Sequence, residues 1–444
     1  MKLLERLDLE KFKLKFSEVE GLGSDLNVYS GLKKNGPYRK PANDFEEILV
    51  MCKRDDLLYA ESFVEHFKNG YPRIFDGFNQ IMRTTVDFRI VTFPNEHPLL
   101  VWNSFRENKK EGSFPVILMD IPKRKSPDSA YYDIKAKFVK EGIGVQIVRC
   151  DTVKNEEILK WSLLSLSIQI YAKMGGIPYI LERSFMSVNE PVLVMGIGFS
   201  IDPMTKERMA GYILFYDENG NWLMSESSAF ELNFESKLGD LAESHIISLI
   251  RSAFDRLRSS FNFEAYPRYN LIVHYMGAET GPTFESSILR AVERFIATDY
   301  NKKMNVYVVK IRSSNFLLVD EESSCSDKST GHNTGLPIGG LLTSGRGYYM
   351  LSTTGCYYGR SNVLTSGSPS PILISIRSRI GSDFTVPEAD LIKSVFAMCR
   401  LNYVSVSNPV SRLPVTVKYA RELALVSLRI GRPPSSLNKI PWFI

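Results

Sequence analysis

The sequence contains 444 residues with a formal net charge of +5, and 44% of the residues are apolar and 11% aromatic. This length predicts two or three domains, and the chain shows neither a run of about 20 apolar residues that could span a membrane nor a signal peptide. The five cysteines form no C-x-x-C pair, which disfavours a zinc site or a disulfide framework. Because the positive charge is mild, it permits nucleic-acid binding without requiring it. We expect a soluble, cytoplasmic protein.

Strands and helices alternate in the first part of the chain. The first 40 residues are charged and mixed, and residues 45–69 predict a helix that stops before Gly70 and Pro72. The apolar run at residues 114–121 is typical of a buried parallel strand. A helix at 126–140, a strand at 144–149 and a long helix at 155–173 are expected to follow. This alternation predicts a doubly wound, Rossmann-like domain.

The remainder of the chain predicts a mixed sheet with helices on its faces. Strands are expected at residues 191–200, 208–216, 222–225, 269–275, 304–311, 348–353 and 371–376. Helices are expected at residues 238–261, 283–298, 387–401 and 414–430, and a polar loop at 321–347. The turn Asp217 to Gly220 joins the second and third strands as a hairpin. An RNase H-like core has this order of elements: a strand, a hairpin, a helix, a strand, a helix and a strand.

Five polar residues of the first domain form the most informative pattern. Tyr131 and Lys135 lie four residues apart on one helix, Gln169 and Lys173 repeat this spacing on the next long helix, and Gln146 lies in the strand between them. Such a set of donors and acceptors without a carboxylate suits a terminal phosphate. Spacing alone favours solvated helix faces. The apolar surroundings of Gln169 and Lys173, and the Gly-Gly-x-Pro turn after them, favour a site.

The segment 167–180, with Lys173-Met-Gly-Gly-Ile-Pro178, resembles the start of the PIWI region in Argonaute proteins. Tyr131-x-x-x-Lys135 and the following Gly142-Ile-Gly-Val-Gln146 look like the pocket of the MID domain that holds a guide 5′-phosphate. The resemblance implies a pocket made by Tyr131, Lys135, Gln146 and Lys173, with Gln169 at a neighbouring polar position. It also implies an α/β fold in which a Rossmann-like MID domain precedes an RNase H-like PIWI domain, without a PAZ domain. We expect an N-terminal segment at 1–40, MID at 41–178 and PIWI at 179–444, as in the short Argonautes.

The chain ends in Ile440-Pro-Trp-Phe-Ile444, which predicts a C-terminus packed into the fold. In similar PIWI proteins the terminal carboxylate and a pocket amide hold a divalent cation beside the guide phosphate. The resemblance therefore implies Mg²⁺ or Mn²⁺, bound by Gln146 and Ile444, in a role that is not catalytic.

The PIWI resemblance predicts a nuclease site that has lost its metal ligands. RNase H-like nucleases hold two divalent ions with clustered carboxylates. By the resemblance, Gly198 and Met276 occupy the first two aspartate positions, and a fourth position falls near Asn402. Glu226 or Glu231 could supply the family's glutamate finger. We therefore predict no target cleavage, and we expect His274 to be an ordinary core residue.

The resemblance implies a guide-dependent nucleic-acid binding protein of prokaryotic defence. The expected guide is a short RNA in preference to DNA, the expected target is DNA, and the expected protein partner carries an APAZ domain with an associated effector. One alternative is an active endonuclease that uses displaced carboxylates such as Asp202 or Asp240. Another is a scaffold that binds no nucleic acid. A small-molecule enzyme of the Rossmann type would need a Gly-rich turn where Lys123-Arg124-Lys125 stands.

Overall fold

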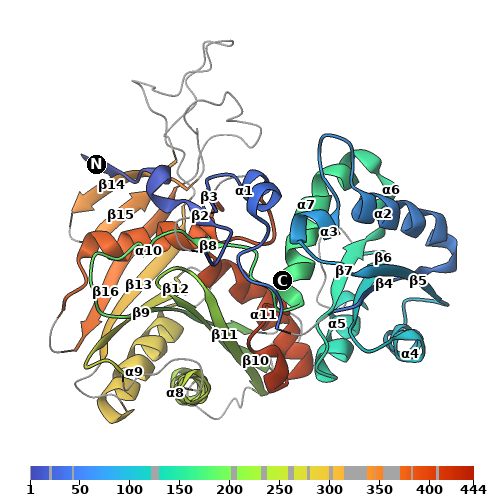
Figure 1. Cartoon of the computed structure of the whole chain (residues 1–444). Coiled ribbons are helices and arrows are strands. Elements are labelled where there is room, and N and C mark those ends of the chain that lie inside the picture. Colours follow the sequence, from blue (N-terminus) through green and yellow to red (C-terminus); the bar gives the residue numbers. More distant parts are fainter. Residues whose placement is uncertain are drawn as a thin grey trace.

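The computed structural model describes two large sheets with helices on their faces and one small sheet (Figure 1). It describes the chain except residues 1, 20–22, 43–44, 122–129, 202–207, 232–237, 259–264, 278–280, 300–303, 315–337, 346, 354–370, 382–383 and 407–409. Within these described ranges, no helix is long and apolar enough to cross a membrane.

The first large sheet is parallel throughout, with the strand order β5-β4-β6-β7. Its strands are β4 (Glu47–Lys53), β5 (Asp87–Phe93), β6 (Ser113–Met119) and β7 (Gln146–Arg149). Its helices are α2 (Leu57–Asn69), α3 (Phe78–Met82), α4 (Pro98–Asn108), α5 (Ala130–Lys140), α6 (Cys150–Lys154) and α7 (Glu156–Lys173). This arrangement confirms the expected Rossmann-like unit.

The predicted helix at residues 45–69 is wrong in its first half. Residues Ile48 to Cys52 form the centre of β4 and are completely buried between β5 and β6. A run of apolar side chains on consecutive positions is typical of a strand covered on both faces. The helix begins only at Leu57, after the short 3₁₀ turn η2 (Arg54–Asp56).

The second large sheet has nine strands in the order β1-β14-β15-β16-β13-β12-β9-β10-β11. The strands are β1 (Lys2–Arg6), β9 (Val192–Ile201), β10 (Arg208–Asp217), β11 (Trp222–Glu231), β12 (Tyr269–Met276), β13 (Met304–Ser313), β14 (Gly340–Gly345), β15 (Tyr348–Leu351) and β16 (Ile372–Ile380). Strand β12 runs parallel to both β9 and β13, whereas β9, β10 and β11 are antiparallel. Strand β14 lies where a loop was expected at 321–347, and most of that interval is outside the described residues.

Helices cover both faces of the nine-stranded sheet. Helices α8 (Leu238–Leu257) and α9 (Gly281–Asp299) pack against one face of this sheet and form a separate apolar cluster with it. Helices α10 (Glu388–Arg400) and α11 (Val415–Ile430) belong to the large cluster on the other face, which continues into the first sheet. Because α11 also packs against α5, it joins the two large sheets.

The N-terminal segment is attached to the second half of the chain by pairing. Strand β1 pairs with β14, and β2 (Leu14–Lys15) pairs with β3 (Ser24–Asp25) and with β8 (Ile180–Leu181) in the small sheet. Helix α1 (Val28–Asn35) follows β3. The domain boundaries near residues 40 and 178 remain predictions, since strand pairing links the segments on either side of them.

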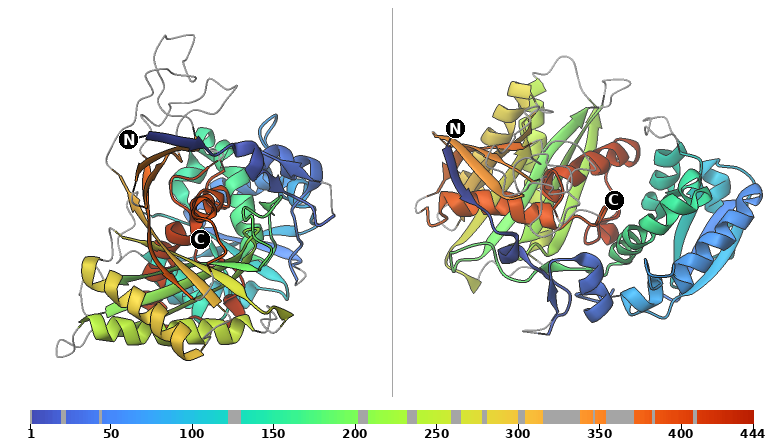
Figure 2. Two further views of the ribbon diagram at one scale, coloured as in Figure 1. Left: turned by 90° about the vertical axis from the view of Figure 1, so that its left-hand side faces the viewer. Right: turned by 90° about the horizontal axis from the view of Figure 1, so that it is seen from above.

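The C-terminus lies between the two large sheets (Figure 2). Trp442 and Phe443 are completely buried, and Ile444 is nearly so. This packing confirms the interpretation of the aromatic end as part of the fold.

Candidate nucleic-acid interface

Two of the predicted pocket residues are joined directly at the beginning of β7. The ammonium group of Lys173, at the end of α7, donates to the side-chain oxygen of Gln146 at 2.7 Å and to the carbonyl of Val145 at 3.1 Å. The amide nitrogen of Gln146 donates to the Ile147 carbonyl at 3.1 Å. Lys173 and Gln146 are both buried, so these contacts hold a cation in a fixed position inside the protein.

Lys135 and Tyr131 form a second group, which meets the C-terminal tail. The Lys135 ammonium group lies 3.3 Å from the Tyr131 hydroxyl, and it donates to the Phe443 carbonyl and to an oxygen of the terminal Ile444 carboxylate. Burial raises the pKa of the Tyr131 phenol, and the Glu422 carboxylate adds to this effect. Tyr131 therefore remains a neutral hydrogen-bond donor at physiological pH.

The tail residue Ile440 lies close to the segments around Gly144 and Gly175. A Cβ atom at Gly144 would lie 3.6 Å from the Ile440 side chain, and one at Gly175 would lie 3.5 Å from it, which are ordinary contact distances. Gly175 has φ +91°, a backbone conformation that favours glycine in the turn after α7. The C-terminal tail thus passes both groups: Ile440 lies near the end of α7, and Phe443 and Ile444 contact Lys135.

Gln169 is the pocket candidate with a different set of contacts. Its side-chain nitrogen donates to the Ser165 carbonyl at 3.1 Å and to the Val404 carbonyl at 3.3 Å. Val404 belongs to the connection between α10 and α11. Gln169 therefore ties α7 to this connection, although it lies one helical turn before Lys173.

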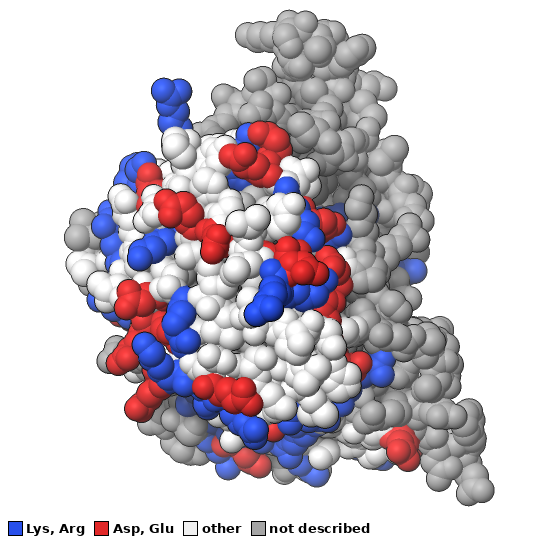
Figure 3. Space-filling model, turned by 90° about the vertical axis from the view of Figure 1, so that its right-hand side faces the viewer, with Lys and Arg blue, Asp and Glu red and all other residues white. Residues whose placement is uncertain are grey.

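On the outer face of the first sheet, the lysine, arginine and acidic side chains of the described residues are interspersed (Figure 3). Several of them pair with each other, as Lys53 does with Asp120 and Arg89 with Glu47. Because these charges balance locally, the buried lysines near the tail are the stronger candidates for anion binding. Residues 123–125, the predicted basic loop, lie outside the described residues.

The two positions expected for catalytic aspartates lie on adjacent strands of the second sheet. The register pairs His274 of β12 with Gly196 of β9 as the last pair of this parallel ladder, and Met276 and Gly198 each lie two residues beyond it. A Cβ atom at Gly198 would lie 2.2 Å from the hydroxyl oxygen of Tyr212, on β10. The Tyr212 ring therefore fills the space that an aspartate side chain would need. This contact depends on strand register, so no local sequence signal reveals it.

The other candidate carboxylates are engaged elsewhere or exposed. Glu226 is completely buried, and its carboxylate contacts Arg256 at 3.0 Å, Arg432 at 2.8 Å and the Asn438 amide at 3.0 Å. Asp240 lies on the exposed surface of α8, 3.9 Å from Arg290. Among the described residues, no three His, Cys, Asp or Glu side chains gather as a metal site. Asp202 lies outside the described ranges, and Glu231 is exposed at the end of β11.

Asn402 and His274 have structural contacts. The Asn402 side chain donates to the Ser405 carbonyl at 2.8 Å and accepts from the Val404 amide at 3.2 Å, so it closes a turn. The imidazole of His274 is fully buried between the hydroxyl groups of Thr416 and Ser394, at 3.0 and 2.9 Å. Burial lowers the pKa of His274 to about 3. The prediction of a satisfied core histidine is confirmed.

Residues 116–429 match the Piwi domain family. The Argonaute protein of Cereibacter sphaeroides is 24% identical over 448 residues, which cover 94% of this chain and 56% of that protein. Drosophila Piwi superimposes with a TM-score of 0.69 at 13% identity, and A. aeolicus Argonaute with 0.60 at 15%. Each comparison covers 100% of this chain and 56% of the other. The chain thus spans about half the length of the relatives it matches.

The fold and these matches define a protein with a Rossmann-like unit followed by an RNase H-like unit. Since the matched region covers more than half of the sequence, the chain belongs to the Piwi domain family, as the Lys173 to Pro178 motif indicates. The described residues form no third large unit that would correspond to a PAZ domain.

Proposed function

We propose that the chain binds the 5′-phosphate of a short guide strand and uses the guide to recognise a complementary nucleic acid. The observation that carries this proposal is a set of buried donors on the segments beside the C-terminal tail. Lys135 donates to the Phe443 carbonyl and to the terminal Ile444, while Lys173 donates to Gln146 of β7. Two ammonium groups, a neutral phenol and an amide suit the oxygens of a terminal phosphate.

In this proposal, Lys173 and Lys135 donate to the phosphate oxygens and Tyr131 contributes its hydroxyl and its ring face. Low accessibility strengthens these hydrogen bonds, because little water competes for the donors. The guide is held by its end and not by its sequence, which leaves the remaining bases free to pair. Specificity then comes from base pairing with the target.

We propose further that Mg²⁺ or Mn²⁺ assists this binding through the Ile444 carboxylate and the Gln146 side-chain oxygen. Carboxylate and amide oxygens are the ligands that hard cations prefer, and the Gln146 oxygen would bind the ion in exchange for, or beside, its hydrogen bond from Lys173. The ion would supply positive charge that offsets the negative charge of the terminal carboxylate and the phosphate. Lys135 donates to the Phe443 carbonyl and to the terminal Ile444, so it already holds the end of the chain.

We propose that the protein does not cleave its target. Gly198 and Met276 offer no side-chain oxygen at the two expected aspartate positions, Tyr212 fills the space at Gly198, and Glu226 is committed to two arginines. A two-metal mechanism requires carboxylates that hold both ions. The rival endonuclease using Asp240 gains no support, since that side chain is exposed on α8.

A binding protein without its own nuclease needs an effector to act on the recognised target. We propose an RNA guide, a DNA target, and a protein partner with an APAZ domain and an associated effector in prokaryotic defence. Membership of the Piwi domain family supports the nucleic-acid part of this proposal. The identity of the partner follows only from the resemblance to short Argonautes.

The test compares short RNA and DNA strands, each with a 5′-phosphate and a 5′-hydroxyl, in Mg²⁺. Phosphorylated RNA should bind most tightly, and Lys173→Ala should weaken its binding by roughly 10- to 150-fold, as expected when a charge-assisted hydrogen bond worth about 1.5–3 kcal/mol is lost. Lys140→Ala, which removes an exposed lysine from α5, is the matched control and should change little. Equal binding of all strands, or of none, would refute the guide pocket.

A further inference from the structure

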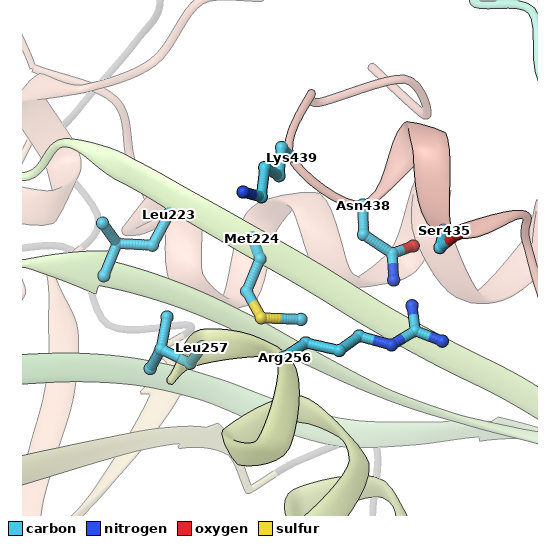
Figure 4. Close-up of a pocket in the computed structure, with 7 residues that line it drawn as sticks. All are labelled: Leu223, Met224, Arg256, Leu257, Ser435, Asn438 and Lys439. Carbon is cyan, nitrogen blue, oxygen red and sulfur yellow. The ribbon is translucent and has the colours of Figure 1, made fainter. Parts of the chain in front are cut away.

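A cavity of about 390 Å³ lies at the edge strand β11 of the nine-stranded sheet (Figure 4). It is lined by β11, the end of α8 and the segment that follows α11, just before Ile440. The residues that line it are Leu223, Met224, Arg256, Leu257, Ser435, Asn438 and Lys439. This volume falls in the range of about 300–1,000 Å³ in which proteins bind small molecules.

The walls of the cavity are mostly apolar. Leu257 and Met224 are almost completely buried, and Leu223 is partly buried beside them. Figure 4 shows Leu223 and Leu257 at one end of the cavity, with the Met224 side chain between them and the polar end. Aliphatic and thioether side chains of this kind pack well against a flat aromatic ring.

The polar end contains a buried hydrogen-bond acceptor without a partner. Asn438 is 3% exposed, and its side-chain nitrogen donates to Glu226 at 3.0 Å, which fixes the orientation of the amide. Its side-chain oxygen has no hydrogen-bond partner among the described residues. Leaving a buried acceptor unsatisfied is costly, so a ligand that offers an N–H group would be favoured here.

Positive charge lies at the rim of the same cavity. Lys439 is exposed and belongs to the lining. The Arg256 guanidinium contacts the Glu226 carboxylate at 3.0 Å, so Glu226 balances part of its charge. Lys439 is therefore the cation most available to an anionic group of a ligand.

We propose that this cavity binds a mononucleotide. The base would lie against Leu223, Met224 and Leu257 and donate an N–H to the Asn438 oxygen, while the phosphate would contact Lys439. A flat apolar body, a donor and an anion are the three features that the lining selects, and a nucleotide combines them in one small molecule. The site differs from the proposed guide pocket, because none of its lining residues contacts Tyr131, Lys135, Gln146 or Lys173 in the hydrogen bonds described above.

The test measures binding of AMP and GMP to the full chain by calorimetry, with adenosine and inorganic phosphate as partial probes. One nucleotide should bind more tightly than either partial probe. Lys439→Glu, at the exposed rim, should weaken nucleotide binding by about tenfold or more, as expected for reversing a charge near a phosphate. Leu223→Trp should abolish binding by filling the cavity, and either variant suffices if the other fails to fold.

Lys173→Ala distinguishes this site from the guide pocket, which could itself accept a 5′-phosphate. Nucleotide binding at the proposed cavity should survive Lys173→Ala and be lost in Leu223→Trp. The reverse pattern would overturn the proposal and assign the nucleotide to the guide pocket. Absence of AMP and GMP binding to both the wild type and Lys173→Ala at millimolar concentration would also overturn it, whatever the result with guide strands.

Discussion

Replacing Gly198 by aspartate tests whether the space for a catalytic carboxylate is closed. A Cβ atom at this position would lie 2.2 Å from the Tyr212 hydroxyl oxygen and 2.7 Å from the ring carbon that bears it. Both distances are far shorter than van der Waals contact, and Tyr212 is only 5% exposed, so its ring must move within packed surroundings. Overpacking of this kind costs about 1–3 kcal/mol.

A double-mutant cycle in urea measures this effect. Gly198→Asp should lower the free energy of unfolding by the stated amount, whereas the added cost should be smaller in a Tyr212→Ser background, where the ring is absent. The coupling between the two substitutions should reach about 1 kcal/mol or more. Ser200→Asp is the control, since it places the same group two residues further along β9 at a partly exposed position. Its effect should stay within about 0.5 kcal/mol.

Additive effects in the cycle would refute the reasoning, because they would show that the Tyr212 ring does not compete for the space at Gly198. A Gly198→Asp variant as stable as the wild type would lead to the same conclusion. If the coupling is found, a variant that carries aspartate at both expected catalytic positions, Gly198→Asp and Met276→Asp, also requires a smaller residue at position 212. Cleavage of a guide-paired target in Mg²⁺ or Mn²⁺ should then be sought in the triple variant and compared with the wild type.

Three further predictions concern the tail, the core histidine and the buried glutamate. Deleting Ile444 moves the terminal carboxylate to Phe443 and should reduce the gain in guide affinity on adding Mg²⁺ to EDTA-treated protein. An unchanged Mg²⁺ response would contradict a cation site that depends on the Ile444 carboxylate. Burial lowers the pKa of His274 to about 3. As the pH falls, the imidazole is therefore protonated in the unfolded chain at a higher pH than in the folded protein. Below about pH 6.5 this group should therefore cost up to about 1.4 kcal/mol of stability per pH unit. His274→Gln should flatten that dependence in unfolding curves, and an equal slope would contradict it. Glu226→Gln leaves Arg256 and Arg432 without their carboxylate. Since both arginines are partly exposed, Glu226→Gln should destabilise the protein by roughly 1–3 kcal/mol in urea unfolding. A neutral effect would contradict a stabilising role for the contacts of Glu226 with the two arginines.

Much of the fold follows from local patterns. The alternation of buried strands and amphipathic helices from residue 114 onward agrees with the observed elements, because periodic burial is recorded in nearby residues. Strand β14, inside the expected loop 321–347, and strand β4, before this region, are exceptions. The consecutive buried residues Ile48 to Cys52 of β4 precede a true helix without a strong break, and only neighbouring strands on both sides decide that they are extended.

By itself, the sequence determined the residue types of the candidate pocket, the glycine turn after Lys173, and the absence of side-chain oxygens at Gly198 and Met276, the positions that the resemblance assigns to catalytic aspartates. The tertiary structure decided what these residues meet. Lys135 reaches the Phe443 carbonyl across a separation of 308 residues, Tyr212 occupies the space at Gly198 through strand register, and Gln169 turns to Val404. Such contacts depend on how strands and helices pack over long chain separations, and spacing along the chain carries no record of that packing.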